Sequence, residues 1–386
     1  HQYSVDGAPV MGDIKVGTAW KTIVVGGLNS GGRGYYALDI TDPNDPKALW
    51  EFTDANLGFS FGNPVIAKRG DGTWIVAFAS GYNNTDGDGK GHLYVLNANT
   101  GALLLDIATS DGSSSDPSGL AKINAWIESS SDNTAKRFYG GDQQGNLWRF
   151  DIDGLLLPNG AAMRLAKFQI NDTTPQPITT KPETVEISGK PVVVVATGRY
   201  LGSSDIADST QQSIYAVKDT LTATGWGDVR ADTANFVRQT FTLNGPVATA
   251  TAASVSNTSV DWATKGGWWI DLPHSRERVN TNLGLQFSTL AVATAIPNGD
   301  ACASGGTAWR YYLNVANGGV VTTNPAGGLF STDGLIMGMT WVQDSNGNAR
   351  IIYQKSNGDN VIETPPVATS SGSGSVRRTS WRELVD

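Results

Sequence analysis

Short runs of β-branched and aromatic residues alternate with clusters of Gly, Asn, Asp and Ser along most of this chain. Examples of the apolar runs are residues 22–25 (Thr-Ile-Val-Val), 74–78 (Trp-Ile-Val-Ala-Phe) and 191–195 (Pro-Val-Val-Val-Val). Runs of this length, bounded by turn residues, are typical of β-strands. Helical periodicity is scarce, and only residues 233–240 suggest a turn or two of helix. The pattern therefore predicts an all-β protein.

One strand pattern returns along the chain, in which aromatic and aliphatic residues follow a small or polar turn and mostly end in Asp or Asn. The clear copies are Gly34-Tyr-Tyr-Ala-Leu-Asp39, His92-Leu-Tyr-Val-Leu-Asn97, Asn146-Leu-Trp-Arg-Phe-Asp151 and Ser213-Ile-Tyr-Ala-Val-Lys-Asp219. Weaker copies are Gly267-Trp-Trp-Ile-Asp271, Trp309-Arg-Tyr-Tyr-Leu-Asn314 and Asp359-Asn-Val-Ile362. The intervals of about 40 to 70 residues approach the length of a four-stranded propeller blade with variable loops.

Each clear copy is preceded by another apolar run that ends in Gly, for example residues 24–27 and 77–81. The pair predicts a hairpin whose first strand passes close to neighbouring backbone, where only Gly fits. A blade of this kind cannot bury both faces alone, whereas radial stacking buries every face and leaves only short edges. We therefore expect one modified β-propeller, with seven blades and irregular insertions. A two-sheet sandwich would not explain the long period.

The propeller is expected to occupy residues 1–386 as one domain. Residues 221–252 fit the blade pattern poorly, and we interpret them as an insertion. Residues 370–376 are rich in Ser and Gly, which predicts a flexible linker. The charged tail after this linker contains one Trp, and we expect it to dock back on the body.

Composition limits the functional classes. The net charge is −8, so the chain lacks the basic excess that nucleic-acid-binding proteins carry. No apolar run approaches the roughly 18 residues of a transmembrane helix. Cys302 is the only cysteine, which rules out an internal disulfide; it is either buried and inert or paired outside this sequence. The chain starts at His1, and we expect it to be a monomeric fragment of a longer exported protein.

Several motifs resemble the C-terminal domain of the PilY/PilC family of type IV pilus biogenesis factors and tip adhesins. Two of them are Gly141-Asp-Gln-Gln-Gly-Asn-Leu-Trp-Arg-Phe-Asp151 and Thr197-Gly-Arg-Tyr-Leu-Gly202. The others lie at residues 3–10, 19–27, 31–34, 267–273 and 380–384. Because the matches fall in order over nearly the whole chain, the set is more specific than any single motif.

The resemblance implies a seven-bladed propeller at the end of a large protein of the cell surface and pilus tip, exported through the periplasm and outer membrane. It implies a non-catalytic domain that promotes pilus extension, opposes retraction and supports adhesion and twitching motility. Its implied partners are minor pilins of the pilus tip complex and a host-cell receptor. Calcium bound by an EF-hand-like loop is a further family trait.

The family calcium loop precedes the Gly-Asp-x-x-Gly-Asn-Leu-Trp motif. By this resemblance its positions here include Glu128, Asp132 and Lys136. Calcium prefers six to eight oxygen ligands, and Lys136 puts an ammonium where an oxygen is expected. We interpret the loop as degenerate, with the lysine charge holding it closed against Asp132 in place of the ion.

A second candidate calcium loop has oxygen ligands at alternate positions, from Asn84, Asp86 and Asp88. Gly89 would allow the sharp turn, and Lys90 would offer its backbone carbonyl. His92 and Val95 follow where further ligands would stand, so the closing acid is absent. A plain Asp-Gly hairpin tip explains the same residues equally well.

Enzymatic alternatives rest on weaker signals. The chain has no Gly-x-Ser-x-Gly, His-Glu-x-x-His or Walker sequence. His92 is interpreted as a turn residue, and His274 and Arg276 to Arg278 as solvated loop residues. A periplasmic quinoprotein-like or sugar-active enzyme remains the alternative, because such enzymes share the propeller scaffold. Trp268, Trp269 and Trp309 are expected to lie in the core.

Overall fold

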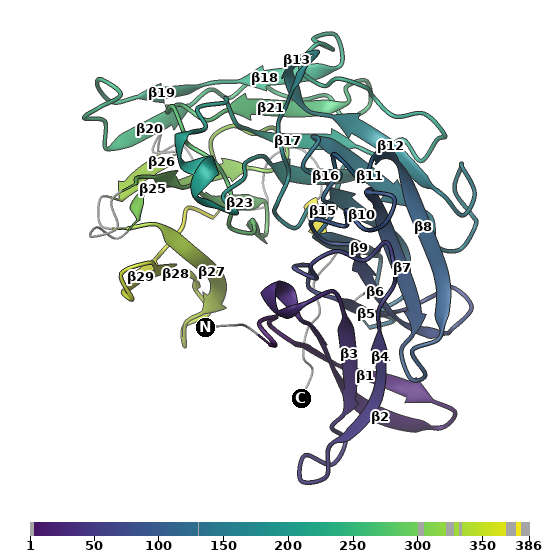
Figure 1. Ribbon diagram of the computed structural model, residues 1–386. Coiled ribbons are helices and arrows are strands. Elements are labelled where there is room, and N and C mark those ends of the chain that lie inside the picture. The colour runs from purple at the N-terminus through teal and green to yellow at the C-terminus, as the bar shows by residue number, and fades with distance from the viewer. Residues whose placement is uncertain are drawn as a thin grey trace. The chain divides into compact units, whose positions relative to one another are not determined.

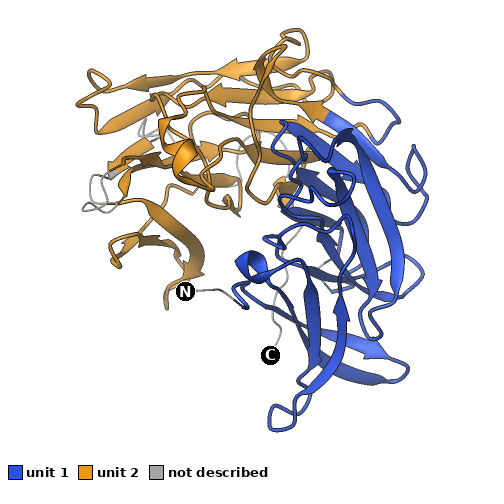
Figure 2. Ribbon diagram, in the orientation of Figure 1, with its two compact units in different colours: residues 1–165, 221–225, 379–386 blue, residues 166–220, 226–378 orange. Residues whose placement is uncertain are grey.

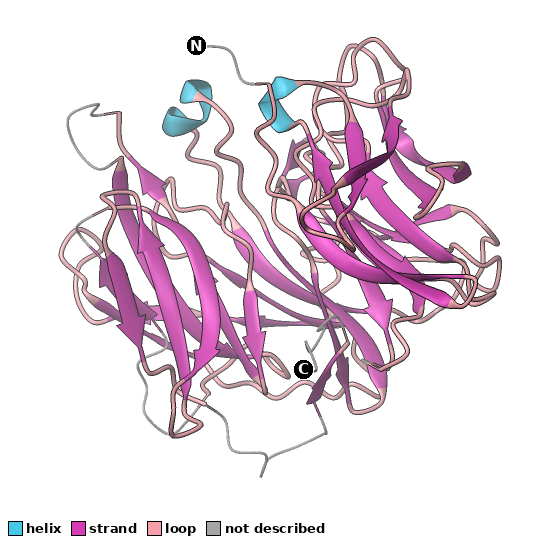
Figure 3. Ribbon diagram, turned by 90° about the horizontal axis from the view of Figure 1, so that it is seen from below, coloured by secondary structure: helices cyan, strands magenta, loops and turns pink. Residues whose placement is uncertain are grey.

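The computed structural model describes residues 4–129, 131–299, 305–321, 328–331, 334–367 and 376–379. Its regular structure is β-strand, apart from two 3-10 helices, η1 (Asn29–Gly31) and η2 (Ser203–Ala207) (Figure 3). The all-β prediction is therefore confirmed for the described residues. Most of the predicted 370–376 linker, the 380–384 motif and Cys302 lie outside them.

The chain divides into two compact units (Figure 2). Unit 1 contains residues 1–165, 221–225 and 379–386, and unit 2 contains residues 166–220 and 226–378. Each unit is built from sheets of mainly antiparallel strands.

Unit 1 contains three four-stranded antiparallel sheets, each formed by consecutive strands in chain order (Figure 1). The first sheet comprises β1 (Val10–Val16), β2 (Ala19–Gly27), β3 (Tyr35–Asp39) and β4 (Lys47–Phe52). The second comprises β5 (Val65–Lys68), β6 (Trp74–Ala79), β7 (Lys90–Asn97) and β8 (Leu103–Gly112). The third comprises β9 (Ile123–Ile127), β10 (Ala135–Gly141), β11 (Asn146–Phe150) and β12 (Ala162–Lys167), whose last residues extend past the unit boundary.

The middle sheet of unit 1 is buried on both faces, because successive side chains of a strand point to opposite sides. Val76 and Phe78 pack against the first sheet, where the Phe78 ring stacks on that of Tyr35 with centroids 3.8 Å apart. Ile75 and Ala77 of the same strand pack against the third sheet. Face-to-face packing of this kind matches the predicted blades, which cannot bury both faces alone.

Unit 2 contains two large sheets, one three-stranded sheet and a small hairpin. The first large sheet has the order β18 (Phe236–Gln239), β21 (Gly267–Asp271), β17 (Ser213–Lys218), β16 (Lys190–Ala196), β15 (Glu183–Ile187) and β30 (Val376–Arg378). The second has the order β19 (Phe241–Leu243), β20 (Ala252–Val255), β26 (Gly328–Ser331), β25 (Gly306–Asn314), β23 (Thr289–Ala293) and β22 (Gly284–Gln286), with β24 (Ile296–Pro297) also on β25. The three-stranded sheet comprises β27 (Ile336–Gln343), β28 (Ala349–Lys355) and β29 (Asn360–Glu363), and the hairpin comprises β13 (Gln169–Asn171) and β14 (Thr174–Pro175).

All seven copies of the repeat lie in strands, but they do not mark seven blades. The copies in β17 and β21 are neighbours in one sheet, paired from Ser213 with Asp271 to Val217 with Gly267. In the described chain, five sheets have four or more strands and β27–β29 form a sheet of three. The prediction of seven blades is therefore not confirmed.

Residues 221–252, interpreted as an insertion, contribute strands to both large sheets of unit 2. β18 pairs in parallel with β21, and β19 pairs with β20. The helical turn predicted within residues 233–240 is wrong, because residues 236–239 form β18. Side-chain pairing with β21 outweighs the weak local helical signal.

A buried tryptophan links the first two sheets of unit 1 at a tight turn. Trp50, in β4, donates its indole N–H to the Ala98 carbonyl at 2.9 Å. Ala98 lies in the β7–β8 turn, where Gly101 has a φ of 70°. A Cβ on Gly101 would lie 2.5 Å from the Trp50 ring, so this turn requires Gly both for its conformation and for the close packing.

Candidate functional site

The Asn84 loop, one of the two candidate calcium sites, connects β6 to β7 in unit 1. Asp86 is paired with the Arg33 guanidinium, which also donates to the Asn83 carbonyl at 3.0 Å. Asp88 accepts a hydrogen bond from the backbone N–H of Lys90 at 2.9 Å. These contacts make the loop a turn held by ion pairs and backbone hydrogen bonds.

His92 is a buried strand residue rather than the turn residue that the sequence suggested. It lies in β7, with Nδ1 2.6 Å from Asp106 and Nε2 3.1 Å from Asp88. Burial acts to lower its pKa, but the hydrogen bonds and charges of Asp106 and Asp88 outweigh burial and raise the pKa of His92. His92 pairs with Ala108 across β7 and β8, and Asp106 lies two residues along β8, so both side chains are on the same face of the sheet.

The four candidate ligands of this loop do not form a calcium shell as they lie. The Asn84 amide donates to the carbonyls of Asn56 and Lys90 at 3.0 and 2.8 Å. The Lys90 carbonyl, which was expected to bind calcium, is therefore already hydrogen-bonded. Among the described residues, no three acidic, histidine or cysteine side chains lie close enough to hold a metal ion. One feature favours a ligand: Asn84 Oδ1 is buried and has no hydrogen-bond partner.

The other candidate loop, which contains Glu128 and Asp132, connects β9 to β10. Glu128 is exposed, and Asp132 pairs with the Lys68 ammonium at 2.6 Å. This hydrogen bond lowers the pKa of Asp132 below its usual range. The ammonium that contacts the carboxylate therefore comes from β5 of the neighbouring sheet, and not from Lys136 as the sequence suggested.

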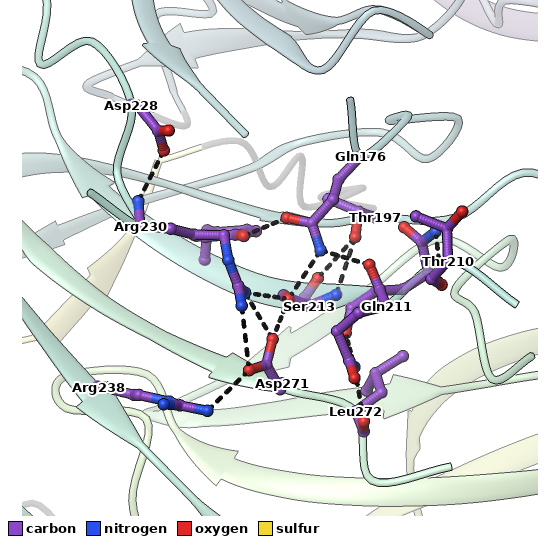
Figure 4. Close-up of polar contacts among 12 residues, drawn as sticks. Gln176, Thr197, Thr210, Gln211, Ser213, Asp228, Arg230, Arg238, Asp271 and Leu272 are labelled. Carbon is purple, nitrogen blue, oxygen red and sulfur yellow. Dashed lines mark hydrogen bonds and ion pairs between the residues drawn. The ribbon is translucent and has the colours of Figure 1, made fainter. Parts of the chain in front are cut away.

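A polar cluster in unit 2 was missed by the sequence analysis (Figure 4). It centres on Asp271, which accepts hydrogen bonds from Ser213 at 2.7 Å, Arg230 at 2.6 Å and Arg238 at 3.0 Å. The two guanidinium groups also lie over the Trp269 ring, 4.3 and 4.8 Å from its centre. Two arginines thus share one carboxylate, and the side chain of Arg238 is 58% exposed.

Further hydrogen bonds extend this cluster into the sheet. Ser213 Oγ also accepts a hydrogen bond from the Gln176 amide at 2.9 Å, and Tyr215 donates its hydroxyl to the Gln176 side-chain oxygen. Burial raises the pKa of Tyr215 well above its usual value, so the phenol stays protonated. The cluster was not predictable because Arg238 meets Asp271 through the parallel pairing of β18 with β21.

Arg278 is buried and His274 is partly buried, with its side chain only 8% exposed, so their assignment as solvated loop residues is wrong. The His274 ring stacks on Trp309 with centroids 4.7 Å apart, and Nδ1 lies 3.0 Å from Glu277. Glu277 also accepts hydrogen bonds from the hydroxyl groups of Thr294 and Tyr311 at 2.6 and 2.8 Å. These contacts fix the loop against β25 and satisfy a carboxylate that would otherwise be costly to bury.

The Arg278 guanidinium donates hydrogen bonds to three backbone carbonyls within residues 199–208. It donates to the Arg199 carbonyl at 3.1 Å and to the Asp208 carbonyl at 2.6 Å, and it also donates to the carbonyl of Asp205. The tryptophans 268, 269 and 309 are at most 5% exposed, which confirms their prediction as core residues.

Comparisons with known proteins agree with the sequence resemblance. A family model described as the PilY1 beta-propeller domain matches residues 1–253. The type IV pilus biogenesis factor PilY1 of Pseudomonas aeruginosa strain PAO1 is 31% identical over 363 residues, covering 83% of this chain and 31% of that protein. A PilY1 homolog of Xylella fastidiosa strain Temecula1 is 31% identical over 422 residues, covering 100% of this chain and 32% of that protein.

The fold is shared with a solved structure. The crystal structure of the Pseudomonas aeruginosa PilY1 C-terminal domain matches with a TM-score of 0.75 at 24% identity, covering 94% of this chain and 84% of that one. This similarity supports the β-propeller fold. The chain spans about a third of the length of its curated relatives. No helix of the described residues is long and apolar enough to cross a membrane. With the family model matching well over half of its length, the chain belongs to the PilY1 β-propeller domain family.

Proposed function

We propose that this chain is the propeller part of a type IV pilus biogenesis factor that acts at the cell surface and pilus tip. The match of the PilY1 propeller model to residues 1–253 carries the proposal. The curated relatives, which are named as pilus biogenesis factors, support it. The role is non-catalytic: the domain binds minor pilins, promotes extension and opposes retraction, and the larger protein contacts a host-cell receptor.

The paired side chains of the described sheets support a role as a rigid binding platform. In unit 2, Arg230 and Arg238 are held by Asp271 and the Trp269 ring. The exposed part of Arg238 offers a fixed cation to a protein partner, because its geometry is set before binding. Preorganised charges of this kind favour specific association with a partner surface of complementary charge.

The test is a strain whose full-length protein lacks residues 1–386, compared with one carrying the intact protein. We expect fewer surface pili and less twitching without the propeller, and recovery of pili when the retraction motor is also removed. Immunoblots of the remaining part control for its stability. Normal piliation and twitching without the propeller would contradict the proposed function.

Calcium modulation at the Asn84 loop is part of this proposal. Its support is the buried Asn84 Oδ1, which has no hydrogen-bond partner and belongs to the same loop as Asp86 and Asp88. The ion would have to replace Arg33 at Asp86 and His92 at Asp88. Calorimetric titration of chelator-stripped protein should give heat that is lost in Asp86→Asn/Asp88→Asn and retained in Asp132→Asn. Heat lost only in Asp132→Asn would move the site to the loop of Glu128 and Asp132.

A further inference from the structure

A cavity of about 540 Å³ opens at the hairpin ends of unit 1. Its main polar and aromatic lining comes from Lys15, Trp20, Lys68, Trp74, Asp132 and Asn133. This volume lies within the range of small-molecule binding sites. All three sheets of unit 1 therefore contribute to one concave surface.

Two of the hairpins build the cavity from the same pair of residue types. Lys15 is directly opposite Trp20 across β1 and β2, and Lys68 is directly opposite Trp74 across β5 and β6. Cross-strand partners have neighbouring side chains on one face, so each hairpin presents an indole beside an ammonium. The two indole rings meet edge to face, with centroids 5.9 Å apart and planes at 72°.

The turns of these hairpins keep the cavity open. Gly17 and Gly72 lie in the lining, and a Cβ on either would meet no atom within 4 Å. The third hairpin is fixed alongside, because the Lys68 backbone N–H donates to the Asn133 carbonyl at 2.9 Å. The open space is therefore bounded by backbone that is itself hydrogen-bonded.

The aromatic lining is unusually accessible. Trp20 is 58% exposed, although an indole is among the largest apolar groups a protein can bury. Isolated exposed apolar residues are ordinary, but paired aromatic rings in a cavity mark a binding surface. Such rings suit a ligand with a flat apolar face and polar edges. A sugar ring has this shape, with C–H groups on its face and hydroxyl groups at its rim.

The charges of the cavity select among sugars. Two ammonium groups and one carboxylate line it, which gives one net positive charge on a chain whose net charge is −8. Lys15 lies 5.9 Å from the centre of the Trp20 ring, and Lys68 shares its charge with Asp132. Asp132 and Asn133 add groups that can bind hydroxyls. From this combination we infer that the cavity binds an acidic oligosaccharide, with its ring on Trp20 and its carboxylate at Lys15.

The test uses α-1,4-trigalacturonate and sialyllactose as carboxylated probes, with maltotriose as the neutral control, in titrations followed by tryptophan fluorescence and calorimetry. We expect a carboxylated probe to bind more tightly than maltotriose, and its affinity to fall with added salt. Trp20→Ala should weaken binding about tenfold or more. Phe287→Ala is the matched control, since Phe287 is an aromatic residue of similar exposure, 55%, in unit 2.

Lys15→Gln separates charge recognition from stacking. It should reduce the preference for the carboxylated probe over maltotriose while leaving the weak affinity for maltotriose unchanged. Circular dichroism would verify that the variants fold. Failure of both carboxylated probes to bind, equal affinity for maltotriose, or equal losses in Trp20→Ala and Phe287→Ala would each overturn the inference. Since the readout is binding by the isolated chain, it is independent of pilus function.

Discussion

The β7–β8 turn allows the energetic cost of a close contact to be separated from that of backbone conformation. Gly101→Ala places a methyl group 2.5 Å from Cγ of Trp50 in a residue whose φ is 70°. Gly154 has the same φ of 70°, but a Cβ there would meet no atom within 4 Å. Both residues lie in unit 1, so Gly154→Ala is a matched control for the conformational strain alone.

The expected magnitudes follow from these two contributions. A left-handed conformation costs a residue with a Cβ about 1 to 2 kcal/mol, which is the whole cost expected for Gly154→Ala. Forcing a methyl group into a packed site adds about 1 to 3 kcal/mol, because Trp50 must move away from its hydrogen bond to Ala98. Gly101→Ala should therefore lower the free energy of unfolding by about 2 to 5 kcal/mol.

Equilibrium denaturation in guanidinium, followed by circular dichroism, measures both variants under the same conditions. The midpoint should fall further for Gly101→Ala than for Gly154→Ala. In a Trp50→Leu background, the excess cost of Gly101→Ala should shrink, because the clashing ring is gone. Equal losses from the two glycine substitutions, within about 0.5 kcal/mol, would refute the argument that Trp50 packing requires Gly101.

Three further predictions concern charged side chains. The folded state raises the pKa of His92, so its ion pairs should stabilise the fold fully below about pH 6.5. This contribution should be lost as the pH rises through the raised pKa. In His92→Asn the melting temperature should therefore depend less on pH between about pH 6 and 9. Arg278→Lys should lower the free energy of unfolding, measured in denaturant titrations, by about 2 kcal/mol. The reason is that an ammonium cannot reach all the carbonyls that the guanidinium binds. An unchanged midpoint would contradict this role. Lys68→Gln should leave the free energy of unfolding nearly unchanged, because its partner Asp132 is half exposed and water screens the ion pair. The same substitution should return the pKa of Asp132 toward its usual value in NMR titrations.

Local sequence pattern was sufficient to predict the strands, because each clear copy of the repeat carries its own aromatic and aliphatic residues. The hairpins could be predicted for the same reason, and the structure pairs β2 with β3, β6 with β7, β10 with β11 and β16 with β17. The number of blades could not be predicted from local sequence, because it depends on which strands pair across loops. The copy at Gly267 joins the sheet of Ser213, although their spacing resembles that between separate blades.

The candidate ligands could be read from their spacing, but their partners could not. Arg33 reaches Asp86 across 53 residues, and Lys68 reaches Asp132 across 64. The polar run from His274 to Arg278 was assigned to solvent because its composition is that of an exposed loop. The covering of His274 and Arg278 depends on Trp309 and on backbone carbonyls far away in sequence, which local composition does not reveal.

The pairing of β30 with β15 has a consequence for folding during synthesis of the chain. Arg377 reaches Glu186 across 191 residues, so β15 is synthesised long before its outer neighbour exists. During that interval its edge presents unpaired backbone groups, which are a template for association with other chains. Completion of this sheet must wait for β30 to emerge, and shortening the chain before Val376 would leave the edge of β15 permanently open to aggregation.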